Sequence, residues 1–212
     1  MAASPFDNAR GRVSPRRTSR RVEERRRPYD LDRLTGVALA VFAERGYDGA
    51  SMDDVARAAG ITKAAIYHHV ASKEALLARG IDRALAALFG VLEEPAAREG
   101  RAIARLRYVV RSVARLALRV RPELTVLVRV RGNSATERDA RERRRAFDRH
   151  VATIVREAQS DGDIDAALDA SVVTKLVFGM CNSVVEWYRD DGPLAANSIA
   201  EHVERLLFET FG

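Results

Sequence analysis

The sequence is poor in the residues that build disulfide frameworks and cysteine-based metal sites. Its 212 residues contain a single cysteine, Cys181, which excludes an internal disulfide and fits a reducing cytoplasm. We expect Cys181 to be a small buried side chain, with a redox sensor as the alternative. No apolar run approaches the ~18 residues that span a bilayer, and the N-terminus lacks the apolar core of a secretory signal. We therefore expect a soluble cytoplasmic protein without a membrane partner.

Catalytic motifs are missing as well. The sequence contains no glycine-rich phosphate loop, no G-x-S-x-G elbow and no paired-cysteine motif. The neighbouring His68 and His69 would point about 100° apart on a helix, so the pair does not chelate one ion. His150 and His202 lie far away and lack flanking ligand patterns. The sequence thus predicts neither an enzyme nor a metal or other cofactor site.

Positive charge is concentrated at one end of the chain. The formal net charge is +6, and residues 1–28 hold nine arginines against three acidic residues, 9 − 3 = +6. Residues 29–212 are therefore neutral overall, and the net charge gives no indication that this part binds DNA. We expect residues 1–28 to form a disordered basic arm. Two roles remain open for it: contact with phosphates or an adjacent minor groove, or a solvated extension.

The most informative segment is 51–77, SMDDVARAAGITKAAIYHHVASKEALL. Ser51 precedes an apolar-periodic run and has Asp54 three residues later as its capping-box partner. Gly60 is suited to end this first helix, because the position after a helix C-terminus often requires a positive φ. Thr62 can cap a second helix of sequence KAAIYHH. Two short helices joined by a tight glycine turn predict a helix-turn-helix.

The second of these helices has the composition of a recognition helix. Ile66 faces inward in the helical pattern. The residues left on the outside are Lys63, Ala64, Tyr67 and His68. Small residues near the start of the helix allow close approach to base edges, and a long basic and an aromatic side chain lie beside them. We expect changes at Lys63 to affect sequence selectivity.

Lys73 begins the next helix, which Ser72 can cap. A positive charge is mildly unfavourable at a helix N-terminus, so helix stability alone does not explain this lysine. A phosphate contact does, because a helix N-terminus and an ammonium together attract an anion. A solvated charge is the alternative. The expected DNA-contacting residues are Ser51, Thr62, Lys63, Ala64, Tyr67, His68 and Lys73.

Residues 31–78 resemble the DNA-binding domain of the TetR family of transcriptional regulators. The matching elements are the helix 34–42 ending in ERGY, then S…VA…AGIT, IYHH and SKE…L in that order. The chain departs from the family pattern at Val70, where an aromatic residue is usual. The resemblance implies that Tyr67 and Lys73 contact the DNA backbone, that the protein is a homodimer, and that it acts as a repressor by default.

The apolar pattern stays helical from residue 72 to the end, without a strand pattern or a repeat. The predicted helices cover 73–92, 101–120, 123–130, 136–160, 170–188 and 196–211, with Pro95 and Pro122 interpreted as breaks. The charged run ERDARERRRAFDRH is interpreted as a solvated helix face. The expected fold is all-α with about nine helices, divided into a helix-turn-helix head at 29–76 and a ligand-binding and dimerisation body at 77–212.

The helix predicted at 170–188 is apolar almost all round, so it must be covered on every side. A partner subunit would cover it, and pairing with the last helix would give a four-helix interface, as the resemblance also implies. The expected interface residues are Val184, Trp187, Ile199, Val203, Leu206, Leu207 and Phe211. Two recognition helices related by a two-fold axis would read a pseudo-palindromic operator in double-stranded DNA.

Ligands of helical bundles bind between the helices. The candidate pocket residues, each with simple core packing as its alternative, are Tyr108, Arg111, Leu127, Phe147, Ile154, Thr174, Phe178, Cys181 and Asn182. The segment WYRDDGPL at 187–194 is similar to that of regulators that respond to acyl-coenzyme A thioesters, which suggests such an effector. Ligand binding would tilt the helix 73–92 and change the operator register. The competing hypotheses are a nonspecific DNA-binding protein that uses its arm and a helical small-molecule carrier.

Overall fold

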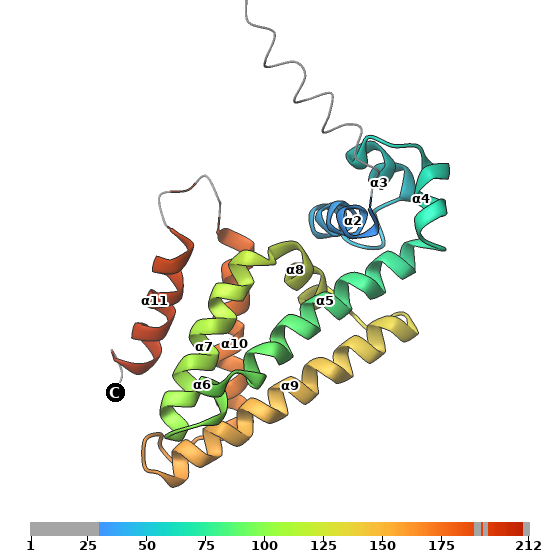
Figure 1. Cartoon of the computed structure of the whole chain (residues 1–212). Coiled ribbons are helices and arrows are strands. Elements are labelled where there is room, and N and C mark those ends of the chain that lie inside the picture. The colour runs from blue at the N-terminus through green and yellow to red at the C-terminus, as the bar shows by residue number, and fades with distance from the viewer. Residues whose placement is uncertain (1–29, 189–191, 193–194, 210–212) are drawn as a thin grey trace, which may run out of the picture. The chain divides into compact units, whose positions relative to one another are not determined.

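The computed structural model describes residues 30–188, 192 and 195–209, so the predicted arm at 1–28 lies outside the described residues. This described part is built from helices alone, which confirms the all-α prediction (Figure 1). The described residues from Leu31 onward form one compact unit. The ten helices described are α2 (Leu31–Arg45), α3 (Met52–Ala59), α4 (Lys63–His69), α5 (Lys73–Glu93), α6 (Pro95–Arg98), α7 (Ala102–Arg119), α8 (Arg121–Arg129), α9 (Ala135–Ser160), α10 (Ala170–Trp187) and α11 (Ala196–Phe208).

Local capping signals build the head, which we define as α2–α4. The Ser51 hydroxyl accepts a hydrogen bond from the Asp54 N–H at 3.1 Å, and the Asp54 carboxylate accepts one from the Ser51 N–H at 3.0 Å. Gly60 ends α3 with a φ of 69°, in the left-handed region that glycine adopts freely. Thr62 begins α4 by accepting from the Ala65 N–H at 3.1 Å. These are the capping roles that the sequence pattern predicts.

The head packs closely on α5 at Gly80. A Cβ atom at this position would lie 2.2 Å from Leu39 Cδ2, and Leu39 itself is fully buried. Only the hydrogen of a glycine therefore fits between α5 and α2. Near the start of α2, Asp32 forms ion pairs of 2.7 Å with Arg79 and 2.6 Å with Arg83, both on α5. The head is thus stabilised by apolar and ionic contacts with α5.

Two helices contain, in their first turn, a proline that the sequence pattern suggested was a break. Pro95 starts the one-turn helix α6, and Pro122 lies in the first turn of α8, which begins at Arg121 and not at Glu123. Proline has no N–H to donate, but the first N–H groups of a helix have no partner within the helix. This position therefore tolerates proline well. The additional helix α6 accounts for the difference between about nine expected helices and ten.

In the rest of the unit, which we call the body (α5–α11), α5, α7, α9 and α10 run side by side, and α11 packs mainly on α7 (Figure 1). The core of the body includes Leu106, Val109, Leu127 and Phe147, all nearly inaccessible to solvent. Within the described residues, none of the helices is both long and apolar enough to cross a membrane.

A buried carboxylate organises the loop between α8 and α9. The Glu137 side chain accepts the backbone N–H groups of Arg131, Gly132 and Asn133 at 2.9, 2.7 and 3.1 Å. Burial acts to raise the pKa of Glu137, but the three N–H donors outweigh it and hold the pKa below its ordinary value. The loop is thereby tied to the first turn of α9.

Candidate nucleic-acid interface

The outer face of α4 carries the predicted recognition residues. Ile66 is fully buried against the head core, as its place in the helical pattern predicts. The residues exposed on α4 include Lys63, Ala64, Tyr67 and His68. Tyr67 is 47% exposed, which is high for a large aromatic side chain and leaves its ring and hydroxyl available. The structure thus brings the four residues together at the surface, while their contact with DNA stays a prediction.

Lys63 is held in place by an acidic residue of α3. Its ammonium donates to the Asp53 carboxylate at 2.8 Å, and this hydrogen bond and the charge of Asp53 raise the pKa of Lys63. Both side chains are about half exposed, at 48% for Lys63 and 60% for Asp53. An exposed pair of this kind is weak, so a phosphate or a base edge can replace the carboxylate.

Ser51 and Thr62 differ in whether their hydroxyl proton is free to donate a hydrogen bond. Besides accepting from Asp54, the Ser51 hydroxyl donates to the Asp54 carboxylate at 2.6 Å, so its one proton is already used. The Ser51 hydroxyl and backbone N–H, followed by Arg45 and Arg57, lower the pKa of Asp54 to about 2. The Thr62 hydroxyl only accepts, from the Ala65 N–H, so its own proton remains available for donation. Ser51 is therefore better explained as a cap.

Lys73 is turned toward the protein. Its ammonium donates to the backbone carbonyls of Tyr47 at 2.7 Å and Ala50 at 2.8 Å, and it lies 4.3 Å from the centroid of the Tyr47 ring. These contacts connect α5 to the loop between α2 and α3. Only the third N–H of the ammonium remains for a phosphate. The sequence hypothesis of a phosphate ligand or a solvated charge did not anticipate this role, because the partners are backbone carbonyls more than twenty residues away.

A second candidate site is a small apolar pocket in the body. The predicted liners Leu127, Phe147, Phe178 and Asn182 do meet there. They are joined by Leu88, Val113, Leu124, Val128, Arg144 and Asp148. The cavity volume is about 20 Å³, enough for roughly one water-sized molecule. A larger ligand must therefore displace the walls.

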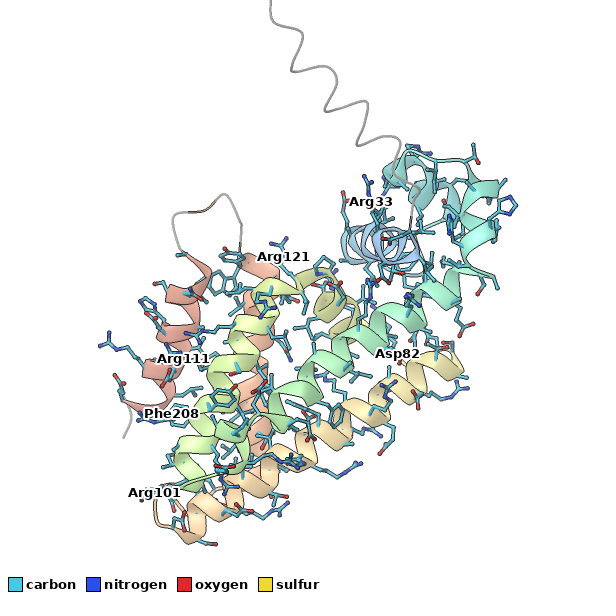
Figure 2. The ribbon with its side chains drawn as sticks, viewed as in Figure 1. Arg33, Asp82, Arg101, Arg111, Arg121 and Phe208 are labelled. Atoms are coloured by element: carbon cyan, nitrogen blue, oxygen red, sulfur yellow. The ribbon has the colours of Figure 1, made fainter. Side chains whose placement is uncertain are left out.

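The other predicted pocket residues lie elsewhere. Figure 2 shows Arg111 on the side of α7 that faces α11, where it pairs with Glu201 at 3.7 Å and Glu204 at 3.5 Å. The Thr174 hydroxyl is buried and donates to the Ala170 carbonyl of its own helix at 2.8 Å. Tyr108, Ile154 and Cys181 do not line the pocket either. These five residues lie at helical positions that turn their side chains to other neighbours.

Cys181 is fully buried, and burial raises the pKa of its thiol to about 12. The thiolate is the reactive form of cysteine, so this side chain is inert at neutral pH. The geometry therefore favours the small buried residue over the redox sensor among the two sequence hypotheses.

Sequence reasoning missed Arg144 and Asp148. Both belong to the charged run of α9 that was interpreted as a solvated face, yet both line the pocket. Asp148 is half-buried, and this burial raises the pKa of its carboxyl despite the nearby Arg144 and Lys175. The sequence did contain one indication that Asp148 lies near the pocket, because it directly follows Phe147, a residue predicted to line it.

Two family models match the chain in succession. Residues 34–79, which span most of the head and the start of α5, match the model of bacterial regulatory proteins of the tetR family. Residues 99–211, more than half of the chain, match the tetracyclin repressor-like C-terminal domain. The chain belongs to the TetR family. It is therefore a DNA-binding transcriptional regulator of the repressor type, and TetR regulators bind operator DNA and dimerise.

Known TetR-family proteins are similar to this chain over different lengths. SCO3833, a TetR-family member from Streptomyces coelicolor A3, is 49% identical, with 83% of this chain and 89% of that chain covered and a TM-score of 0.77. The negative transcriptional regulator IcaR of the biofilm operon icaADBC in Staphylococcus aureus is 36% identical over 50 residues, which are 24% of this chain. The match spans only 27% of IcaR. AibR, whose structure contains isovaleryl coenzyme A and operator DNA, shares the fold at 24% identity over 82% of this chain and 96% of its own, with a TM-score of 0.72.

Three of the residues predicted to form the dimer interface are buried within one chain. Val184, Ile199 and Val203 are covered within one chain, at 1%, 4% and 6% exposure, so they do not offer a surface to a partner. Of the remaining predicted residues, Trp187 and Leu206 are exposed, Leu207 is half-buried, and Phe211 lies outside the described residues. The apolar face of α10 that stays open comprises Val172, Leu176, Gly179 and Trp187, which we call the α10 stripe.

Metal-ligand chemistry finds no support in the part of the chain that the structure describes. There, three or more histidine, cysteine, aspartate or glutamate side chains do not come together in a group that could hold an ion. His68 and His69 are both exposed on α4, and the nearest contacts of His202 are with Ser198 of its own helix, at 2.6 Å to the carbonyl.

Proposed function

We propose that this TetR-family regulator is a homodimeric repressor that releases a pseudo-palindromic operator when a small apolar or acyl-coenzyme A effector binds in its body. Lys63, Ala64, Tyr67 and His68 on α4 read the operator, and Thr62 adds a phosphate contact. The regulator acts in the cytoplasm, where both DNA and small metabolites reach it.

The observation that best supports control by an effector is that α8 contacts both the body pocket and the head. Val128 lines the body pocket, and the next residue, Arg129, donates to the backbone carbonyl of Ala43 at 2.7 Å, near the end of α2. Leu88 of α5 also lines the pocket, and the same helix packs against the head at Gly80. A ligand that separates the pocket walls must therefore move two helices that hold the head. A coupling of ~1–3 kcal/mol between the two sites is enough for a useful switch.

The α10 stripe supports the homodimer. Leu176 is 69% exposed, Val172 50% and Trp187 53%, and their spacing places them on one side of α10. Large apolar side chains gathered on one exposed face mark an association surface. Gly179 lies within the stripe and has open space around its missing Cβ, so a second helix can approach closely there. We propose that this stripe, with Leu206 of α11, is the dimer contact.

The acyl-coenzyme A version of the effector rests on similarity. AibR was crystallised with isovaleryl coenzyme A and operator DNA, and its fold is the fold of this chain. The pocket offers aromatic and aliphatic walls for an acyl group, including Phe147 and Phe178 with ring centroids 5.3 Å apart. A small apolar molecule without coenzyme A would use the same walls.

Fluorescence anisotropy with the full-length protein tests the proposal. The protein is titrated onto DNA from its own upstream intergenic region and onto scrambled DNA at physiological salt. We expect saturation at two protomers per site and at least ~10³-fold preference for the upstream sequence. Adding isovaleryl or octanoyl coenzyme A should then release the DNA. Binding that is equal for both probes would contradict a sequence-specific repressor.

A variant that lacks residues 1–28 separates the remaining hypotheses. If the arm drives nonspecific binding, its deletion abolishes DNA binding, and binding of the full chain falls steeply with salt. If the head reads an operator, preference for the upstream DNA survives the deletion. A small-molecule carrier would bind the acyl-coenzyme A compounds and ignore both DNA probes.

A further inference from the structure

The body pocket has a polar end made by two helices. Arg144 and Asp148 stand one turn apart on α9, and Asn182 stands on α10, one turn beyond Phe178. All three side chains are half-buried, while the pocket walls beneath them, such as Leu127 and Phe147, are almost fully buried. The three polar groups therefore lie at the opening of the pocket, where a ligand would pass or remain.

Asp148 differs from every other acidic residue of α9. Glu137 accepts three backbone N–H groups, Asp139 pairs with Arg143, Glu142 pairs with Arg149, and Glu157 pairs with Arg105. Among the described residues, none donates a hydrogen bond to Asp148 or lies within ion-pair distance of it, although Arg144 is one turn away on the same helix. The Asp148 oxygens are not among the buried unpartnered side-chain atoms, so water can satisfy them in the free protein, and a ligand with an N–H or O–H group can take the place of that water.

We propose that Asp148 determines effector specificity by accepting a hydrogen bond from an N–H donor of the ligand, whose apolar part inserts between Phe147 and Phe178. This inference rests on the proposed function, because it assigns the ligand chemistry of the same pocket. The chemical class is an aliphatic chain that carries an amine or amide N–H. A ligand that ends in a free carboxylate does not fit this role, since an ionised carboxylate has no proton to donate to Asp148.

The pocket is too small for such a ligand unless its walls move apart. The cavity of about 20 Å³ does not hold an alkyl chain, so the chain has to separate the aromatic rings. Phe147 packs between Phe89 and Phe178, with ring centroids 5.8 and 5.3 Å away. Displacing Phe147 moves the wall that faces α5 and α8. The donor that binds Asp148 thus selects the ligand, and the chain behind it changes the helix positions.

The N–H donor can come from two sources. One is a free alkyl amine or amide, and the other is the amide of the pantetheine arm in an acyl-coenzyme A. Calorimetric titrations of the full-length protein, without DNA, with octylamine, octanamide, octanoate and octanoyl coenzyme A distinguish them. We expect octylamine and octanamide, or octanoyl coenzyme A, to bind at least ten-fold more tightly than octanoate.

Two variants test the role of Asp148 itself. Asp148→Leu removes both acceptor oxygens at a similar size, and Asp139→Leu makes the same change at an exposed site of α9. We expect Asp148→Leu to weaken binding of whichever N–H ligand binds best by at least ten-fold, to reduce the affinity difference between that ligand and octanoate, and to retain the normal melting temperature. Asp139→Leu should leave all four affinities unchanged.

Three results would overturn the inference: tighter binding of octanoate than of the N–H ligands, equal effects of the two variants, or no binding of any of the four compounds. Its failure is distinguishable from failure of the proposed function, because calorimetry reads the pocket and anisotropy reads the operator. Selective ligand binding without operator preference would keep the role of Asp148 and contradict the repressor.

Discussion

The ammonium of Lys73 lies against Tyr47, bonded to its backbone carbonyl at 2.7 Å and 4.3 Å from the centre of its ring. This contact fixes the loop after α2 to the first turn of α5. It replaces the expected picture of a lysine extended to DNA with a residue whose first role is to hold the head together. The two roles can be distinguished by experiment. Loss of the internal contacts lowers the free energy of unfolding, whereas loss of a phosphate contact lowers the affinity for DNA.

Lys73→Met should lower the free energy of unfolding by ~1–2 kcal/mol, because it removes two hydrogen bonds to backbone carbonyls and a cation–π contact. Urea denaturation checks this value. Lys63→Met is the matched control, since its exposed ion pair with Asp53 contributes little to stability. Equal stability of Lys73→Met and the unmodified protein would show that the internal contacts of Lys73 are unimportant.

Tyr67→Ala should weaken DNA binding by ~1–2 kcal/mol without a change in melting temperature, because the side chain is exposed and we expect it to contact a phosphate. Anisotropy with the upstream and scrambled probes measures the loss, which should be similar for both. Tyr67→Phe isolates the hydroxyl and should account for part of the effect. Unchanged affinity of Tyr67→Ala would remove this residue from the interface.

Gly80→Ala should destabilise the protein by ~1–3 kcal/mol, because the new Cβ would lie 2.2 Å from the buried Leu39 side chain. Thermal unfolding followed by circular dichroism gives the change. Gly90→Ala on the same helix is the control, since a Cβ there meets nothing within 4 Å, and the higher helix propensity of alanine should stabilise it. The two substitutions are therefore expected to have opposite signs.

Asp54 predicts a stability change in acid. Its pKa in the folded protein is about 2, below its ordinary value of 3.8, so folding favours the ionised form. The resulting stabilisation is fully present above about pH 4 and is lost as the pH falls toward about 2. The stability difference between the unmodified protein and Asp54→Asn should be constant from pH 7 to about pH 4 and then shrink. A difference that grows on acidification would contradict the assignment.

Leu176→Asp should weaken the homodimer by at least ten-fold, because it places a charge in the middle of the proposed apolar contact. Sedimentation equilibrium measures the dissociation constant. Thr153→Asp introduces the same charge at an exposed position of α9 and should leave the dimer intact. A dimer that is unaffected by Leu176→Asp would have its contact away from the α10 stripe.

The head could be predicted from the sequence because its signals are local. Ser51, Gly60 and Thr62 act within three or four residues of themselves, and each has the capping role that its position in the pattern predicts. The body could be predicted less well, because the sequence does not show which side of an apolar helix is buried by other helices of the same chain. Val184 and Leu176 are equally apolar, yet the first is buried by other helices and the second faces outward.

The charged run of α9 illustrates the same limit. Arginines at 143 and 149 pair with acidic neighbours at the surface, as a solvated face predicts. Asp148 belongs to the same run, but it is partly covered in the pocket opening, next to the buried Phe147. Helical periodicity places Asp148 at the edge of the apolar face of α9. Whether a residue at that edge is covered or exposed depends on how the neighbouring helix packs against it.

The nine residues of α8 have a consequence for how such a regulator can change over evolution. Val128 shapes the pocket, and Arg129 holds the head, so the two functions occupy adjacent positions of one short helix. A substitution on α8 that adapts the pocket to a new ligand also risks altering DNA affinity in the absence of that ligand. Variation on α9 and α10 carries less of this risk, because the head packs mainly on α5 and α8. New ligand preferences should therefore accumulate at positions such as 144, 148 and 182 while α8 changes slowly.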